Sequence, residues 1–349
     1  MWPSPFPGID WILPRGAIPE VDGPTAPPIA SVRFRTRKDD RSVITRRTLL
    51  QRSGKAAAAA AAACMLPRRL RAMPLGLPAG IQLYAVRTSL QANPAGTLKQ
   101  LRAIGYRQVE AAGYAGMSAE AFGKLISAAG LQCPSAHVQF TETDFDKGFA
   151  ETHAVGAQYT VSSALAFAIL PRRPRRPGVP FTPPPALTRD DFMKMADLMS
   201  RIGKAAKANG LIYAYHNHNL EFVRMPDGSY GYDLLLKQTD PETVKFEADC
   251  GWMTVAGADP VHYFHAYPGR FRMLHVKDFR PIQHPTSSLG GPDRPQGIEL
   301  GRGFVKYDRI FRAAKTAGIQ HVFAEQEAPY TPNDMGAAEV DYKFLASFS

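Results

Sequence analysis

The sequence has few cysteines and no long apolar run. Its 349 residues include three cysteines, Cys64, Cys133 and Cys250, too few for a disulfide framework. We expect Cys133 and Cys250 to be small buried hydrophobic residues. The alanine run 56–63 is far shorter than the roughly 20 apolar residues that a membrane-spanning helix needs. These absences exclude a disulfide-stabilised scaffold and predict no stable membrane span.

Residues 79–349 carry only a small excess of basic over acidic side chains. The formal net charge is +11, but residues 1–78 hold 13 Lys and Arg against 5 Asp and Glu. Residues 79–349 hold 29 against 26, a net charge of +3. A nucleic-acid-binding domain needs a basic face, and no nucleic-acid-binding motif accompanies the N-terminal excess. We therefore expect no nucleic-acid partner.

The N-terminal part reads as two segments that precede the fold. Residues 1–41 are rich in Pro, Gly and Arg and lack periodicity, which indicates a disordered extension or a start codon assigned too far upstream. In residues 42–74, Arg46 and Arg47 precede the alanine run. This pattern resembles a twin-arginine signal, which implies export after folding to the periplasm or beyond. Two alternatives stay open: an alanine-rich helix, and a lipoprotein cleavage site at Cys64.

Residues 75–349 alternate short apolar runs with amphipathic stretches, as expected for one catalytic domain. We expect strands at residues 80–86, 107–113, 131–140, 157–164, 211–218, 243–252, 271–279 and 319–327. We expect helices at 95–105, 118–130, 188–210 and 304–318, with Ser118 and Thr188 as N-caps. The length is close to the roughly 250 residues of a (β/α)8 barrel. The alternation predicts an α/β fold of that kind, a closed parallel TIM barrel rather than an open sheet.

Two long segments interrupt the alternation. Residues 170–186 hold so many prolines that neither a helix nor a central strand can form. We interpret them as a lid whose arginines meet an anionic substrate, or as a solvated linker. Residues 281–303 form a second long loop.

Polar side chains recur where the expected strands end. They are Glu110, His137, His216, His218, Asp249, His275 and Glu325. Active sites of such barrels lie at the C-terminal ends of the strands, so these side chains converge. Imidazole nitrogen with carboxylate oxygen suits Mn²⁺, Zn²⁺, Fe²⁺ or Co²⁺ better than Ca²⁺. The sequence therefore predicts a site for one divalent metal ion, with Mg²⁺ also admitted.

Six motifs together resemble a known family. "GIQLYAVR", "TLKQLRAIGYRQVEAAG", "YHNHNLEF", "EADCGW", "LHVKD" and "AEQE" are similar to the sugar phosphate isomerase/epimerase family of xylose isomerase-like TIM barrels, over residues 79–349. The resemblance implies that His216, Asp249, His275 and Glu325 bind the metal. His216 stands where keto-sugar epimerases have a glutamate, which puts a two-glutamate epimerisation in doubt and favours the dehydratase and keto-glycoside branch. His218 remains an alternative ligand to His216.

The resemblance implies a metal-dependent isomerase or epimerase that acts on a sugar or keto-sugar through an enediolate. Glu325 and His137 are candidate general bases, and Glu110 is expected to hold a sugar hydroxyl or to orient His137. The expected substrate contacts are His218, Glu221, Lys277 and Trp252, with Tyr84 and Phe140 as further apolar walls. Lys277 has a second reading as part of a rim salt bridge with Asp278 or another acid.

Three other functions stay open. The same residues suit a lyase that eliminates from a 3-keto-glycoside or a cyclitol, and a non-catalytic carbohydrate-binding barrel. An endonuclease IV-like barrel needs more metal ligands and a basic surface, which the net charge of residues 79–349 disfavours. The expected partner is a small-molecule carbohydrate, and a homo-oligomer is left open.

Overall fold

The structure is a computed structural model that describes residues 73–163, 165–170, 186–290 and 294–348. The expected N-terminal extension lies outside these residues. The same is true of the expected export signal, apart from its last two positions, and of residues 171–185 of the proline-rich segment. Within the described part, no helix has both the length and the apolar character needed to cross a membrane.

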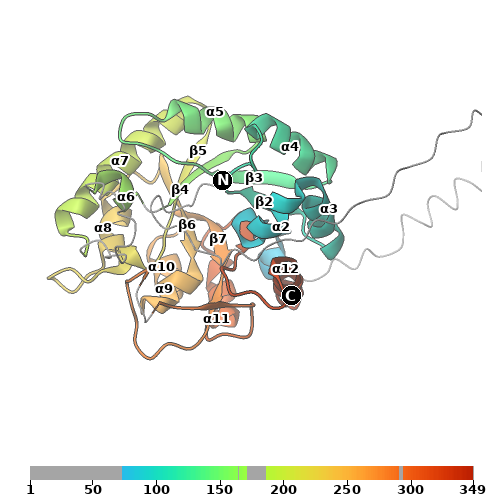
Figure 1. Ribbon diagram of the computed structural model, residues 1–349. Helices are drawn as coiled ribbons and strands as arrows, with labels where there is room; N and C mark the ends of the chain where they lie inside the picture. The colour runs from blue at the N-terminus through green and yellow to red at the C-terminus, as the bar shows by residue number, and fades with distance from the viewer. Residues whose placement is uncertain (1–72, 164, 171–185, 291–293, 349) are drawn as a thin grey trace, which may run out of the picture. The chain divides into compact units, whose positions relative to one another are not determined.

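Eight parallel strands close into a barrel (Figure 1). In chain order the barrel strands are β1 (Ala79–Gln82), β2 (Gln108–Ala111), β3 (Gln132–His137), β4 (Tyr159–Ser163), β5 (Ile212–His216), β6 (Val244–Asp249), β7 (Phe271–Val276) and β10 (His321–Ala324). Each pairs with its neighbours in the chain, and β10 pairs with β1 to close the ring. The (β/α)8 barrel expected from the sequence is confirmed.

Helices surround the barrel (Figure 1). The helices are α2 (Arg87–Ala92), α3 (Pro94–Ile104), α4 (Ala119–Ala128), α5 (Asp146–Val155), α6 (Ala166–Ile169), α7 (Arg189–Ala208), α8 (Gly231–Gln238), α9 (Cys250–Val255), α10 (Pro260–Ala266), α11 (Tyr307–Ala314) and α12 (Asp334–Leu345). Short 3₁₀ turns occur at Pro74–Gly76, Leu83–Val86 and Leu220–Phe222. The large core cluster packs these helices onto the strands, and it contains both Cys133 and Cys250.

The helix starts read from the sequence are confirmed. Thr188 Oγ1 accepts a hydrogen bond from Asp191 N, and Asp191 Oδ2 accepts one from Thr188 N, so the two residues form a capping box for α7. Ser118 Oγ accepts from Ala121 N at the start of α4. The helix expected at 304–318 is shorter, as α11. The sequence left the helices α2, α5, α6, α8, α9, α10 and α12 unassigned.

A cluster of apolar side chains fills the barrel interior on the N-terminal side of the strand ends. Tyr159, Val161, Ala214, Met273 and Phe323 form a separate buried cluster, although they come from strands on opposite sides of the ring. Side chains two residues apart on a strand share a face. The next inward positions after Ala214, Met273 and Phe323 are therefore His216, His275 and Glu325. The alternation of these strands thus places an apolar cluster under a polar layer.

Two strands end earlier than expected because a side chain starts a helical turn. Gln82 Oε1 accepts from Tyr84 N, so β1 gives way to a 3₁₀ turn. Asp249 Oδ1 accepts from Trp252 N, so β6 ends at Asp249 and α9 begins at Cys250. The prediction of a strand at 243–252 is therefore wrong for its last residues, because β6 ends at Asp249.

The strand expected at 271–279 is two strands. After β7, residues of β8 (Asp278–Phe279) pair antiparallel with β9 (Gly297–Ile298), outside the barrel. The Asp278 carboxylate accepts hydrogen bonds from Gly301 N, Gly303 N and Val305 N. One buried carboxylate therefore organises the end of the second long loop.

Candidate active site

The converging polar side chains lie buried at the C-terminal ends of the strands. Glu110, Asp249 and His275 are fully buried, and His216 and Glu325 are 2% and 7% exposed. Each comes from a different strand or from the residue directly after one. The structure therefore brings together the residues that the sequence placed at separate strand ends.

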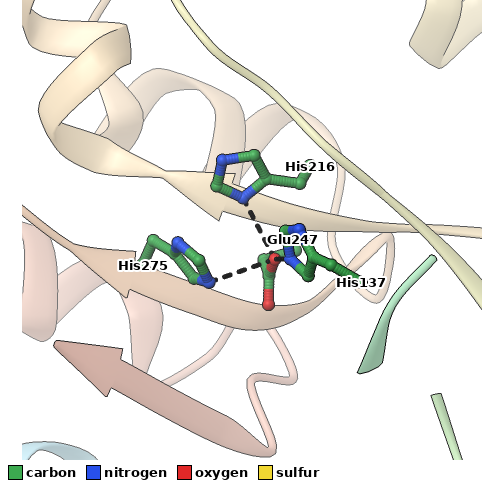
Figure 2. A group of neighbouring side chains, drawn as sticks. All are labelled: His137, His216, Glu247 and His275. Atoms are coloured by element: carbon green, nitrogen blue, oxygen red, sulfur yellow. Dashed lines mark hydrogen bonds and ion pairs between the residues drawn. The ribbon is translucent and has the colours of Figure 1, made fainter. Parts of the chain in front are cut away.

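The centre of the group is a residue that the sequence analysis missed, Glu247 on β6. Its Oε2 lies 2.9 Å from His137 Nε2, 3.0 Å from His216 Nδ1 and 3.2 Å from His275 Nε2. Figure 2 shows the three imidazole rings around this carboxylate. Glu247 lies two residues before Asp249, so strand alternation was the signal that points it inward.

His275 joins two further carboxylates. Its Nε2 lies 2.6 Å from Glu110 Oε2, and its Nδ1 lies 2.9 Å from Glu325 Oε2. Burial opposes a charge on this imidazole, but Glu247 and Glu110 raise its pKa well above the usual value. In the same way, Glu110 and Glu247 overcome the effect of burial and raise the pKa of His137 to about 9.

Glu110 holds other side chains in place. It accepts hydrogen bonds from Gln82 Nε2 and Ser135 Oγ, and it lies 3.2 Å from His137 Nε2. Burial alone would raise the pKa of Glu110, but His137 and His275 hold it below its usual range. Of the two roles expected for Glu110, the geometry fits the orientation of His137.

Among the described residues, two overlapping groups of donor atoms fit a metal ion. One is the expected set, His216, Asp249, His275 and Glu325; the other is His137, His216, Glu247 and His275. Within each group the donor atoms lie within 4.8 Å of one another. Mixed imidazole and carboxylate donors suit a divalent transition metal.

The first group offers the better fit. Asp249 Oδ2 is buried without a hydrogen-bond partner, and Lys277 Nζ is 3.9 Å away. Burial raises the pKa of Asp249 to about 7 against the effect of Lys277, so the carboxylate lacks sufficient compensation for its charge. Glu247 Oε1 also lacks a partner, but Glu247 Oε2 already engages the three imidazole nitrogens of the second group.

Lys277 is a buried counter-ion. Its Nζ lies 2.8 Å from Glu327 Oε1 and 3.1 Å from Glu325 Oε2. Glu327, which the sequence analysis missed, also pairs with Arg294 Nη2 at 2.8 Å. The salt bridge is therefore with these acids, because Asp278 is occupied by backbone amides of the second loop.

Glu221, an expected substrate contact, is turned away from the cavity and holds the backbone in place. Its carboxylate accepts hydrogen bonds from Tyr215 OH at 2.6 Å and from His218 N at 2.8 Å. It is fully buried and does not line the cavity described below. Glu221 thus holds the backbone that carries His218.

Trp252 and Phe140 are also placed differently from the expectation. The Trp252 ring packs on Phe279, with ring centroids 4.5 Å apart, and Lys277 Nζ lies 5.1 Å from the Trp252 ring centroid. Phe140 packs on Phe149 of α5. Neither lines the cavity, whereas the third expected wall residue, Tyr84, does.

A cavity of about 390 Å³ opens beside the donor groups. An inner group of lining residues belongs to the polar layer: His137, His216, His218, Glu325 and Glu327. An outer group comes from the loop after β2 and from α5: Tyr114, Met117, Lys147 and Glu151. The volume lies within the range of about 300–1,000 Å³ of small-molecule sites.

Comparisons with known proteins agree with this architecture. A family model described as xylose isomerase-like TIM barrel matches residues 98–348. An inosose dehydratase of Lacticaseibacillus casei is 27% identical over 196 residues, which cover 54% of this chain and 64% of that protein. The alignment thus spans less than two thirds of that relative.

Two solved structures share the fold. A sugar phosphate isomerase/epimerase from Parabacteroides distasonis ATCC 8503 has a TM-score of 0.61 and 24% identity, covering 77% of this chain and 94% of that one. The structure of IOLI protein with a binding zinc atom has a TM-score of 0.57 and 14% identity, covering 78% and 98%. At these identities the likeness shows the fold alone.

Proposed function

Because this chain belongs to the xylose isomerase-like TIM barrel family, we propose that it is a metal-dependent lyase that removes water from a polyhydroxylated ring ketone. The ring is a keto-cyclitol or a keto-sugar. The relative named inosose dehydratase supports this choice of reaction. The observation that carries the proposal is the set of four donor atoms, two of whose residues, His216 and Glu325, line the cavity.

A divalent ion held by His216, Asp249, His275 and Glu325 would supply a Lewis acid for the substrate carbonyl. The chain's own residues must then accept the proton next to the carbonyl and return one to the departing hydroxyl. Glu325 and His137, the two expected proton carriers, both line the cavity.

The contacts of these two residues support opposite tasks for them. Glu110 Oε2 and Glu247 Oε2 both face His137 Nε2, at 3.2 Å and 2.9 Å, and these two carboxylates favour a proton on the ring. His137 is therefore the proton donor to the departing hydroxyl. Glu325 accepts hydrogen bonds from Lys277 and His275, which keep it a carboxylate, and it is the acceptor of the carbon-bound proton.

The isomerase or epimerase expected from the sequence is the second candidate. The six motifs that resemble the sugar phosphate isomerase/epimerase family favour it. In a two-base epimerisation, a second carboxylate faces the substrate on the side of His216. The carboxylate found there, Glu247, is fully buried, engages three imidazoles and does not line the cavity. Elimination with His137 as the proton donor needs no carboxylate on that side, and we therefore rank it first.

The test follows water loss and proton exchange separately. Purified protein, loaded in turn with Mn²⁺, Zn²⁺ and Co²⁺, is incubated with an inosose in deuterated water, and the product is followed by mass spectrometry and ultraviolet absorbance. We expect loss of one water and a conjugated product, both abolished in Glu325→Gln. The surface variant Glu120→Gln, whose partner is Lys124, is the matched control.

Two outcomes would overturn the lyase proposal. Deuterium uptake without water loss, on inososes and keto-sugars alike, identifies an epimerase or isomerase. Binding without exchange or water loss identifies the non-catalytic carbohydrate-binding barrel.

A further inference from the structure

Ser163, the last residue of β4, belongs to the polar layer but has no task in the proposed reaction. Tyr159 and Val161 of the same strand are part of the apolar cluster inside the barrel. Side chains two residues apart on a strand share a face, so Ser163 is the next inward position after Val161. It lines the cavity together with His137 and His216. The alternation that brings the histidines to the cavity thus brings this hydroxyl there as well.

Ser163 stands between two residues of the proposed reaction. It pairs with His216 of β5 in the strand register, and His137 ends β3 on the other side of β4. The rings of His137 and His216 meet edge to face, with centroids 5.1 Å apart. A small side chain at residue 163 leaves room for this contact, and an alanine would leave the same room. The ring contact therefore accounts for the size of Ser163 but not for its hydroxyl.

The Ser163 hydroxyl has no hydrogen-bond partner among the described residues. The preceding residue, Ser162, is different: it is buried, and its Oγ lies 2.7 Å from Tyr213 OH. Because neighbouring side chains on a strand point to opposite faces, Ser162 faces away from the cavity. A serine hydroxyl can donate one hydrogen bond and accept two, which suits an alcohol group. Ser163 therefore presents a neutral group to the cavity that fits a substrate hydroxyl.

Glu325 lies across the barrel from Ser163. It follows β10, and three strands separate β10 from β4 in either direction around the ring. Both Glu325 and Ser163 line the cavity. A ring ketone bound between them has a carboxylate on one side and a neutral hydroxyl on the other.

These positions bear on the substrate carbon next to the ketone, which loses its proton in the proposed elimination. His216 belongs to the donor group at the carbonyl, and His137 is the proton donor to the departing hydroxyl. The carbon that loses the proton lies between these two substrate groups, so we expect it beside β4, the strand between β3 and β5. Since this carbon is tetrahedral, its hydroxyl points away from Glu325 when its hydrogen faces Glu325.

We infer that Ser163 binds the hydroxyl on the carbon that loses the proton, and so selects ring ketones that carry this hydroxyl in one configuration. The inference rests on the proposed function, since it names a specificity-determining residue of the same cavity. Ser163 takes no part in proton transfer.

Three probes test this contact by binding. Scyllo-inosose is a ring ketone with a hydroxyl on both carbons next to the carbonyl, and each enantiomer of 2-deoxy-scyllo-inosose lacks one of these two hydroxyls. Metal-loaded protein is titrated by calorimetry in a His137→Asn background, which removes the proton donor and leaves the four metal donors in place. We expect scyllo-inosose to bind about two- to tenfold more tightly than one of the enantiomers, the size of one neutral hydrogen bond.

Adding Ser163→Ala to this background identifies the residue that makes the contact. It should abolish the preference for scyllo-inosose over that enantiomer and leave the comparison with the other enantiomer unchanged. Ser162→Ala is the matched control on the same strand and should keep both results, because Ser162 contacts Tyr213 instead of the cavity. An undiminished preference in Ser163→Ala would overturn the inference, as would equal losses of affinity for all three probes.

Water loss from scyllo-inosose in the wild type is scored separately. If no water is lost while Ser163→Ala removes the preference, the reaction proposal fails and the hydroxyl contact remains. If water is lost and Ser163→Ala keeps the preference, the inference fails and the reaction proposal remains. No binding of any probe, in the wild type or in His137→Asn, would overturn the inference.

Discussion

Asn217 continues the pairing of β5 and β6 beyond the point where the strand ladder stops. Its Oδ1 accepts a hydrogen bond from Asp249 N at 3.1 Å, and its Nδ2 donates to Asp249 O at 3.3 Å. The last backbone pair of these strands is His216 with Glu247. One amide side chain thus holds the backbone of Asp249 against the residues that carry His216 and His218.

Removal of the Asn217 side-chain amide should weaken metal binding, although Asn217 is not itself one of the donor residues. In Asn217→Ala we expect metal affinity to fall about 10- to 100-fold, the range known for residues that orient ligands. Equilibrium dialysis with Zn²⁺ measures it. Asn219→Ala is the control, because Asn219 Nδ2 donates to Thr286 O and Ser288 O in the second long loop. An unchanged affinity in Asn217→Ala would show that Asp249 needs no such support.

The two donor groups give opposite results for two variants. If His216, Asp249, His275 and Glu325 bind the ion, Asp249→Asn should lose it and Glu247→Gln should retain about one ion per chain. His218→Ala should also retain it. Metal analysis of the purified variants measures this. Loss in Glu247→Gln with retention in Asp249→Asn would move the site to the other group.

Lys277 should be essential to stability because it neutralises buried acids. In Lys277→Met, Glu325 and Glu327 lose their nearest buried cation. Breaking a buried ion pair by removing one partner costs about 3–5 kcal/mol in free energy of unfolding. Urea unfolding measures it. The exposed pair of Lys124 and Glu120 provides the control, since Lys124→Met should leave the free energy of unfolding nearly unchanged. Equal, small losses in both variants would contradict this reading of Lys277.

The sequence predicted the barrel because each strand is short, apolar and followed by an amphipathic helix. It predicted the positions of His216, Asp249, His275 and Glu325 because a closed parallel barrel brings strand ends together. Glu247 was missed because it lies two residues before Asp249, inside a run read as plain strand. The sequence also failed to predict where the side chains of Glu221 and Trp252 lie, and the reason is different. Each is near the site in sequence, but local hydrogen bonds and ring packing turn them away from the cavity, and only side-chain coordinates show this.

The export signal stays a prediction with a direct test. Arg46 and Arg47 carry it, so Arg46→Lys with Arg47→Lys should keep the folded protein inside the cell. Cell fractionation and immunoblotting of the full chain in a bacterium with a twin-arginine pathway measure this. Arg68→Lys with Arg69→Lys changes a second arginine pair outside the motif and should leave export intact. Equal distributions of the two double variants would contradict the signal assignment.

Asp341 on α12 should make the protein less stable as pH rises. It is 1% exposed and accepts a hydrogen bond from Leu300 N at 2.8 Å. Burial, with Glu299 and Asp278 nearby, raises its pKa to about 8, whereas an aspartate in the unfolded chain has a pKa of about 3.9. The folded state therefore holds the proton more tightly than the unfolded chain does.

The stabilisation that the Asp341 proton provides is complete below about pH 4 and is lost as pH rises towards about 8. Asp341→Asn keeps an oxygen for Leu300 N and stays neutral, so its free energy of unfolding should fall less between pH 5 and pH 8 (about the lower part and the top of that window) than that of the wild type. Urea unfolding at both pH values measures the difference. The exposed Asp197→Asn, which lacks this environment, should follow the wild type. Parallel curves for Asp341→Asn and the wild type would mean that Asp341 is ionised in the folded protein.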